Sequence, residues 1–224
     1  MSGYGQFCPV AKAMEVLDER WTLLVIRELM AGSSRFNEIR RGNPRISPAL
    51  LSKRLTSLER AGLVHRDQGT GQPSYSLTPS GEDLRPIVMA LGIWGTRWIG
   101  ELGDADLDPH LLMWDIKRSV KVEGWPRGRT VIGICFDDVP RRIASWWLVV
   151  TGDDLDVCDV DPGFEPTATV RTSLRALTEI WRGDRSWEQA IGSGRLLIEG
   201  PSGVRRSLPT WIGQGQFAAV PRDS

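Results

Sequence analysis

Residue types that often carry chemistry are sparse in this sequence. Its 224 residues include three cysteines and two histidines, namely Cys8, Cys135, Cys158, His65 and His110. Three scattered cysteines do not form a disulfide framework, and without paired cysteines the histidines predict no metal site. The sequence has neither a Gly-Lys-Ser/Thr phosphate loop nor a Gly-x-Ser-x-Gly nucleophile motif. We therefore expect no catalytic residue, no cofactor and no enzyme activity.

Cys8 is the strongest candidate for a reactive side chain. Pro9 follows it at an expected helix start, where the helix dipole lowers the pKa of a thiol, and Lys12 lies one turn further on. These features make Cys8 a redox candidate. The alternative is a buried, inert thiol, because free cysteine is among the most buried residue types. Cys135 and Cys158 fall in strand-like runs, where core packing is expected.

Basic residues gather in one stretch of a chain whose 28 Lys and Arg balance 28 Asp and Glu. Residues 35–66 carry eight basic residues against two acidic ones. Such a block favours nucleic acid as a partner, the alternative being a solvated helical surface. No apolar run approaches the ~20 residues that cross a bilayer. The first residues also lack the pattern of a secretory signal, so we expect a cytoplasmic protein without a membrane span.

Two domains are expected, because the two parts of the chain differ in composition. Residues 1–100 carry a net positive charge and residues 101–224 a net negative charge. Seven of the ten tryptophans lie in the second part. The acidic segment 101–109, which ends in proline, is the expected junction. We predict one domain over 1–100 and another over 109–224.

Three helix signals follow one another in the first part. An apolar pattern with helical spacing covers residues 10–30, with a break expected near 18–20. A short helix is expected over 35–41. A Gly-Asn-Pro turn separates it from a third helix, which begins at Pro48 and ends near Gly62.

The third helix has two chemically different faces. Ser47 is a good N-cap, and Pro48 suits the first helical position. One face carries three leucines spaced for burial, Leu51, Leu55 and Leu58. The other is small, hydroxyl-bearing or cationic, as a helix in the major groove requires: Ala49, Ser52, Lys53, Thr56, Ser57 and Arg60. A short helix, a turn and such a second helix form a helix-turn-helix motif.

A β-hairpin and a long helix are expected next. Residues 63–67 and 74–78 flank a Gly/Pro loop. A hairpin at this place is a wing, with four side chains expected to touch the DNA backbone or minor groove: Arg66, Gln68, Gln72 and Tyr75. Ser80 is the candidate N-cap of the long helix. This helix carries an apolar stripe, which we interpret as a dimer surface or, alternatively, as packing on the second domain: Ile87, Leu91, Trp94 and Trp98.

These motifs resemble HxlR-type winged-helix transcriptional regulators over about the first hundred residues. The segments that carry the resemblance are Cys8–Ala11, Arg20–Leu29, Arg35–Arg40, Ile46–Leu55, Leu58–Val64 and Tyr75–Gly81. It implies a homodimer that binds a pseudo-palindromic operator in double-stranded DNA, reading bases with the Ser47–Arg60 helix and touching the backbone with the wing. The expected DNA-binding residues are Arg35, Arg45, Ser47, Pro48, Ala49, Ser52, Lys53, Thr56, Arg60, Arg66, Gln68 and Tyr75. In some members a cysteine at the position of Cys8 senses oxidants or electrophiles.

The second part is predicted to be α+β, with helices packed on a mostly antiparallel sheet. Strands are expected over 129–136, 145–150, 155–160, 167–172 and 195–199. Helices are expected over 111–122, after the cap Ser173, over 186–191 and over 204–211.

This part resembles the sterol-carrier-protein type 2 domain over roughly residues 109–215. The resemblance rests on the order of elements and on Gly192–Gly200. It implies an apolar tunnel between sheet and helices, and hence a lipid-like or other hydrophobic small ligand. The candidate ligand-binding residues are Trp114, Phe136, Trp146, Trp147, Trp181, Trp187 and Trp211, with Phe217 beside them. The alternative is that these aromatic side chains simply fill the core.

The leading hypothesis is a dimeric regulator in which an apolar effector, held by the second domain, changes the spacing of the two recognition helices. Two alternatives remain open. One is a thiol-switch regulator that depends on Cys8, and the other is a lipid carrier in which DNA binding is secondary.

Overall fold

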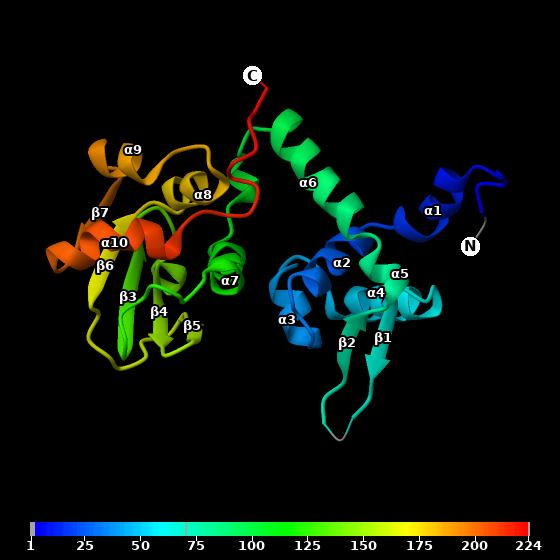
Figure 1. Cartoon of the computed structure of the whole chain (residues 1–224), viewed down its shortest axis with the longest axis horizontal. Helices are drawn as coiled ribbons and strands as arrows, with labels where there is room; N and C mark the ends of the chain where they lie inside the picture. Colours follow the sequence, from blue (N-terminus) through cyan, green and yellow to red (C-terminus); the bar gives the residue numbers. More distant parts are fainter. Residues whose placement is uncertain (1–2, 70, 224) are drawn as a thin grey trace. The chain divides into compact units, whose positions relative to one another are not determined.

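The computed structural model describes residues 3–69 and 71–223 and divides into two compact units, Met1–Gly92 and Ile93–Ser224 (Figure 1). The division falls inside α6 (Arg85–Trp98), upstream of the acidic segment 101–109. Thr70, in the expected wing loop, lies outside the described residues. Within the described ranges no helix combines the length and the apolar character that crossing a membrane requires.

The N-terminal unit is mostly helical and carries one hairpin. Its elements are α1 (Pro9–Leu17), α2 (Thr22–Met30), α3 (Phe36–Arg41), α4 (Pro48–Arg60), β1 (Val64–Asp67), β2 (Ser74–Leu77), α5 (Pro79–Glu82) and the first part of α6. The strands pair antiparallel, with Val64 opposite Leu77 and Asp67 opposite Ser74. The helices enclose an apolar core made of Leu17, Val25, Ile26, Leu29, Ile39, Ile46, Leu51, Leu55, Leu58 and Val64. This arrangement confirms the predicted winged helix-turn-helix fold.

The expected break in the first helical run is confirmed. α1 ends at Leu17 and α2 begins at Thr22. Between them Trp21 has a φ of 79°, in the left-handed region that bulky side chains rarely adopt. Such a conformation costs of order 1–3 kcal/mol and persists only where surrounding contacts hold it. The junction between α1 and α2 must therefore be fixed by tertiary contacts.

The helix start predicted at Ser80 is wrong. The N-cap is Thr78, whose Oγ1 accepts a hydrogen bond from the Gly81 amide at 3.2 Å, and Ser80 lies inside the short α5. The Ser80 hydroxyl donates instead to the Gly62 carbonyl at 3.3 Å. The Thr78 hydroxyl donates to the same carbonyl at 2.6 Å, so tertiary contacts at the end of α4 select the cap. A separate helix, α6, then begins at Arg85.

The C-terminal unit packs helices on a five-stranded sheet. Its elements are η1 (Asp104–Asp106), α7 (Pro109–Ser119), β3 (Arg129–Phe136), η2 (Arg141–Ile143), β4 (Ser145–Thr151), β5 (Asp154–Cys158), β6 (Ala168–Thr172), α8 (Leu174–Arg182), α9 (Trp187–Gly192), β7 (Leu196–Glu199) and α10 (Ser202–Ile212). The strand order is β5-β4-β3-β6-β7. Only the β3–β6 pair is parallel among these described strands, so the expected α+β class with a mostly antiparallel sheet is confirmed.

Most aromatic side chains predicted to line a ligand site take part in the core of this unit. Phe136, Trp146, Trp181 and Trp187 are buried, whereas Trp114, Trp147 and Trp211 are partly exposed. The buried indoles find polar partners within the unit: Trp146 donates to the Ile143 carbonyl at 2.9 Å, Trp181 to Asp115 at 2.6 Å, and Trp187 to the Gly213 carbonyl at 2.9 Å. Such contacts are those of core tryptophans, and a ligand-lining role stays a prediction.

Candidate DNA-binding surface

α4 begins and ends where local chemistry predicts. Ser47 Oγ accepts a hydrogen bond from the Leu50 amide at 3.2 Å, and Pro48 occupies the first turn, where its missing N–H costs nothing. At the other end Gly62 has a φ of 72°, the left-handed conformation that stops a helix. The helix therefore presents a defined surface between Pro48 and Arg60.

The two faces of α4 separate by burial as the spacing predicts. Leu51, Leu55 and Leu58 are 0%, 2% and 1% exposed and lie in the core. The small, hydroxyl-bearing and cationic side chains are exposed to solvent: Ala49, Ser52, Lys53, Thr56 and Arg60. Ser57 lies between the two faces and is half-buried. A helix whose outer face is short and polar can approach the floor of a DNA groove closely.

Arg54 interrupts the apolar face and fastens α4 to the junction between α1 and α2. It is 8% exposed, and its Nε donates to the Arg20 backbone carbonyl at 2.9 Å. Its Nη1 forms an ion pair with Glu19. Both contacts lie next to Trp21, whose left-handed backbone needs such support. Arg54 is thus a positioning residue for the candidate recognition helix.

A buried carboxylate on α2 fixes the turn between α3 and α4. Glu28 is fully buried and accepts hydrogen bonds from Arg27, at 3.2 Å from Nε and 2.7 Å from Nη2. Arg27 Nη2 also donates to the Gly42 carbonyl at 2.8 Å. A Cβ on Gly42 would lie 1.9 Å from Glu28 Cδ, so a side chain at this position would have to displace the buried carboxylate. Glycine is required here for close approach, since its φ of −74° is ordinary.

The wing is attached to the start of α3. The Tyr75 amide donates to the Ser34 carbonyl at 2.8 Å, and Arg35 forms an isolated β-bridge with Ser74. The Arg35 guanidinium also donates to the Gln72 carbonyl. The exposed Arg35 guanidinium therefore helps to orient the wing, and its expected contact with DNA stays a prediction. Figure 1 shows the hairpin extending away from the helices of its own unit.

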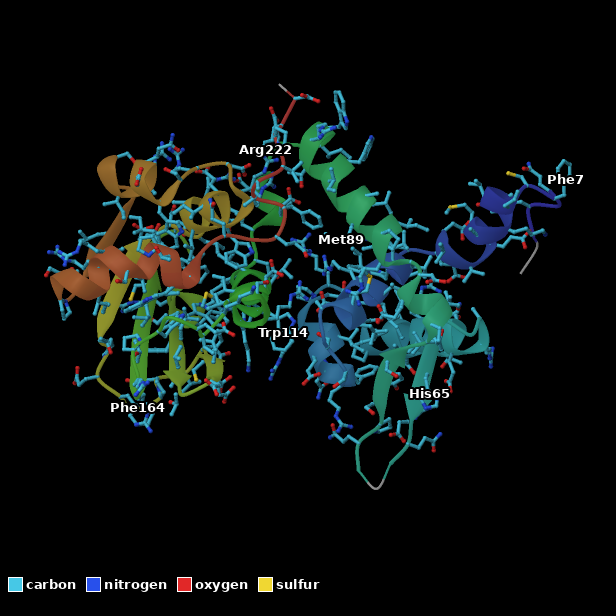
Figure 2. The ribbon with its side chains drawn as sticks, in the orientation of Figure 1. Phe7, His65, Met89, Trp114, Phe164 and Arg222 are labelled. Carbon is cyan, nitrogen blue, oxygen red and sulfur yellow. The ribbon has the colours of Figure 1, made fainter. Side chains whose placement is uncertain are left out.

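The predicted DNA-binding residues differ in how far their side chains are exposed to solvent. Tyr75 is half-buried and packs against the core of the unit, so its ring supports the wing. Arg66 is also half-buried, whereas His65 is exposed on β1 (Figure 2). The remaining predicted residues are all exposed: Arg35, Arg45, Ser47, Pro48, Ala49, Ser52, Lys53, Thr56, Arg60 and Gln68.

Exposed cations without internal partners supply the positive charge of this surface. Among the described residues Lys53, Arg60 and, on α3, Arg40 make no hydrogen bond or ion pair through their side chains. Each is exposed, so it is available to a phosphate. The basic block therefore divides into available cations and cations that hold the fold, of which Arg54 is the clearest.

Cys8 lies at the N-cap of α1 and is half-buried. The backbone amides of Ala11 and Val10, at the start of this helix, lower the pKa of its thiol. Cys158 differs, because burial and the nearby Asp156 carboxylate raise the pKa of its thiol. Within the described residues no cluster of three histidine, cysteine or acidic side chains can hold a metal ion.

The sequence patterns did not predict which residues position α4. Arg54 occupies a core position of the helical repeat, three residues after Leu51, and a charge at such a position signals a buried pair. Glu28 likewise falls inside the apolar run of α2. Gly42 was interpreted only as part of a turn, because close approach to Glu28 depends on contacts between helices.

Comparison with known proteins locates one family in this chain. The HxlR-like helix-turn-helix family matches residues 16–102. The HTH-type transcriptional regulator YvaP of Bacillus subtilis (strain 168) is 41% identical over 98 residues, which are 42% of this chain and 91% of that protein. The regulator sll1512 of Synechocystis sp. is 34% identical over 98 residues, 42% of this chain and 73% of that protein.

The chain is also similar to the reduced form of the transcriptional regulator YodB from B. subtilis. The identity is 33% and the TM-score 0.37, with 44% of this chain and 100% of that chain covered. The resemblance expected for the first hundred residues is confirmed by the family match and by YvaP. This chain belongs to the HxlR-like helix-turn-helix family.

Proposed function

We propose that this protein is a transcriptional regulator that binds double-stranded DNA through α4. The observation that carries the proposal is the division of α4 into a leucine face inside the core and an exposed face of short polar and cationic side chains. Ser52 and Thr56 read base edges, and Lys53 and Arg60 contact phosphates. The wing, attached to α3 through Arg35, contacts the backbone beside the groove.

The active form is a homodimer that binds a pseudo-palindromic operator. The support for this lies on α6, which has no buried residue. Its stripe residues Ile87, Leu91, Trp94 and Trp98 are 49%, 48%, 54% and 58% exposed. Large apolar side chains in a row on one helix are typical of a surface that a second copy covers. A two-fold axis then presents two α4 helices to successive major grooves.

DNA binding is tested with the full chain and a randomised duplex library. Recovered sequences are expected to share a pseudo-palindrome, and fluorescence anisotropy with that site should show affinity falling steeply as salt rises. The matched pair is Lys53→Gln on α4 and Lys121→Gln, an exposed lysine of the other unit. Only the first should weaken binding. Equal affinity for all duplexes together with a flat salt dependence would contradict the proposal.

The C-terminal unit is proposed to be a sterol-carrier-like domain that binds an apolar effector. Helices packed on one mostly antiparallel sheet, in the expected order, support this interpretation. Trp114, Trp147 and Trp211 are partly exposed, and we propose that they meet the ligand (Trp114 is labelled in Figure 2). Mass spectrometry of small molecules that co-purify with the native protein is the direct test. Regulation requires the effector to alter DNA affinity, so equal affinities with and without it would exclude coupling.

A thiol switch at Cys8 is the second candidate function. The observation that favours it is the pair of backbone amides that lowers the pKa of this thiol at the start of α1. Oxidant should change the DNA affinity of the native chain and leave a Cys8→Ser variant unaffected. If both respond alike, the switch lies elsewhere or does not exist.

A further inference from the structure

The N-terminal unit contains a partly enclosed pocket behind the candidate recognition helix. Its volume is about 250 Å³, and α1, the α1–α2 junction, the start of α2 and α4 form its walls. At ~30 Å³ for a water molecule, the pocket accommodates on the order of eight water-sized groups, which suits a small organic molecule. The lining residues are Glu15, Val16, Glu19, Thr22, Arg54, Ser57, Leu58, Arg60 and Ala61.

The charged side chains of this pocket are nearly all neutralised by partners. Glu15 pairs with Lys12 at 2.9 Å, and Glu19 pairs with Arg54. Arg60 differs, because it makes no hydrogen bond or ion pair with any described residue. One positive charge without an internal partner therefore belongs to the lining residues, which also include Ser57.

The rest of the lining favours an apolar body. Val16, Leu58 and Ala61 contribute methyl and methylene surface next to the polar groups. Apolar walls with a few convergent polar groups are typical of small-molecule sites. A compact molecule with one anionic end matches this distribution, because its charge can reach Arg60 while its body excludes water from the apolar wall.

We propose that this pocket binds small monocarboxylic acids with an apolar body, and that the bound carboxylate pairs with Arg60. Aromatic and alicyclic acids of about nine heavy atoms fit the volume. Arg54 positions the pocket wall through Glu19 and the Arg20 carbonyl, and it does not contact the ligand carboxylate, since its own charge is already paired.

The site gives the DNA-binding unit a second level of control, and this part rests on the proposed function. Arg60 belongs both to the pocket and to the exposed face of α4. A carboxylate held by Arg60 competes with a DNA phosphate for the same guanidinium. Ligand and DNA therefore weaken each other by the same factor, as linkage requires.

Binding is measured first without DNA, so that its result is independent of the proposed function. The full chain is titrated with benzoate, phenylacetate and cyclohexanecarboxylate by calorimetry and ligand-observed NMR, with neutral benzamide as the isostere. Benzoate is expected to bind at least about tenfold more tightly than benzamide, the effect of one charge-assisted hydrogen bond. Failure of all three acids to bind, or equal binding of benzamide, would overturn the proposal.

Three variants test whether benzoate binds in this pocket. Arg60→Gln should weaken benzoate binding at least about tenfold, since it removes the cation. Ala61→Leu fills the pocket and retains Arg60, and it should also abolish binding. Arg141→Gln removes an exposed arginine of the other unit and should bind benzoate as the native chain does. Unchanged binding by both pocket variants, or equal loss in all three variants, rejects this location.

The DNA experiment then tests the competition. Saturating benzoate should lower operator affinity in the native chain and have no effect in Arg60→Gln. Unchanged affinity in the native chain, while benzoate is shown to be bound, overturns the competition at Arg60. If no duplex binds at all, the proposed function has failed, whereas the titrations without DNA still decide whether the pocket binds acids.

Discussion

The Nε of Arg54 donates to the backbone carbonyl of Arg20 at 2.9 Å, so that a side chain of α4 holds the junction where α1 meets α2. Arg54 also pairs with Glu19 and is 8% exposed. The expected recognition helix is thereby linked to the α1–α2 junction through one guanidinium. A lysine has a single terminal nitrogen in place of this fork, so it reproduces both contacts poorly.

Replacing Arg54 should destabilise the N-terminal unit more than replacing an exposed arginine does. Arg54→Met leaves the Arg20 carbonyl and the Glu19 carboxylate without their partner, at a cost of about 1–3 kcal/mol. Thermal unfolding monitored by circular dichroism measures the change, with exposed Arg40→Met on α3 as the matched control. Equal melting temperatures of the two variants would show that the buried contacts of Arg54 do not contribute to stability.

A methyl group at Gly42 should be poorly tolerated. The added Cβ would meet the Glu28 carboxylate at 1.9 Å, and overpacking of this kind costs about 1–3 kcal/mol. Gly95→Ala is the control, because it lies within α6 with open space around it and should stabilise the helix by about 0.5–1 kcal/mol. Denaturant titration of both variants checks the opposite signs. If Gly42→Ala left the free energy of unfolding unchanged, the α3–α4 turn would have to shift freely to admit the methyl group.

Substitutions on the exposed face of α4 should separate affinity from sequence preference. Lys53→Gln removes one phosphate contact, so binding to every duplex weakens and the slope of log affinity against log salt falls by about 0.9. Ser52→Ala and Thr56→Ala instead change which bases are preferred. Anisotropy titrations on the selected site and on single-base variants distinguish the two effects. A uniform response to all three substitutions would contradict the assigned roles.

A charge in the α6 stripe should break the dimer. Trp94→Glu places a carboxylate in the proposed interface, and sedimentation velocity is expected to show a monomer at concentrations where the native chain is dimeric. Leu197→Glu is matched to it, since Leu197 on β7 and Trp94 are both 54% exposed. This control should remain a dimer. Retention of the dimer by Trp94→Glu would remove α6 from the interface.

Cys8 should be alkylated at lower pH than Cys158. Backbone amides lower the pKa of the Cys8 thiol, whereas burial and Asp156 raise the pKa of the Cys158 thiol. The thiolate is the reacting form, so the pH midpoint of iodoacetamide labelling lies lower at Cys8. Peptide mass spectrometry over a pH series reads both sites in one sample. In denaturant the two midpoints should converge, because the native surroundings that separate them are lost.

Local chemistry was sufficient to predict the elements that present the candidate surface. A cap such as Ser47, a proline at the first helical position and leucines spaced by three or four residues specify α4 without reference to the rest of the chain. The hairpin could be predicted equally well, because its loop residues and the alternation along its strands are short-range signals. The same rules were wrong at Ser80, which was predicted as the N-cap of the long helix: Thr78 caps the short α5 instead, and the long helix α6 begins at Arg85.

Short-range signals were enough to predict most of the helices and strands, the two faces of α4 and the family resemblance of the first part, since all three follow from the order and spacing of neighbouring residues. Contacts between distant segments turn Arg54 inward, bring the Glu28 carboxylate against Gly42 and attach Arg35 to the wing. These roles depend on distances between segments far apart along the chain. An arginine therefore either holds the fold together or faces solvent, and the difference depends on which segment lies opposite it once the chain has folded.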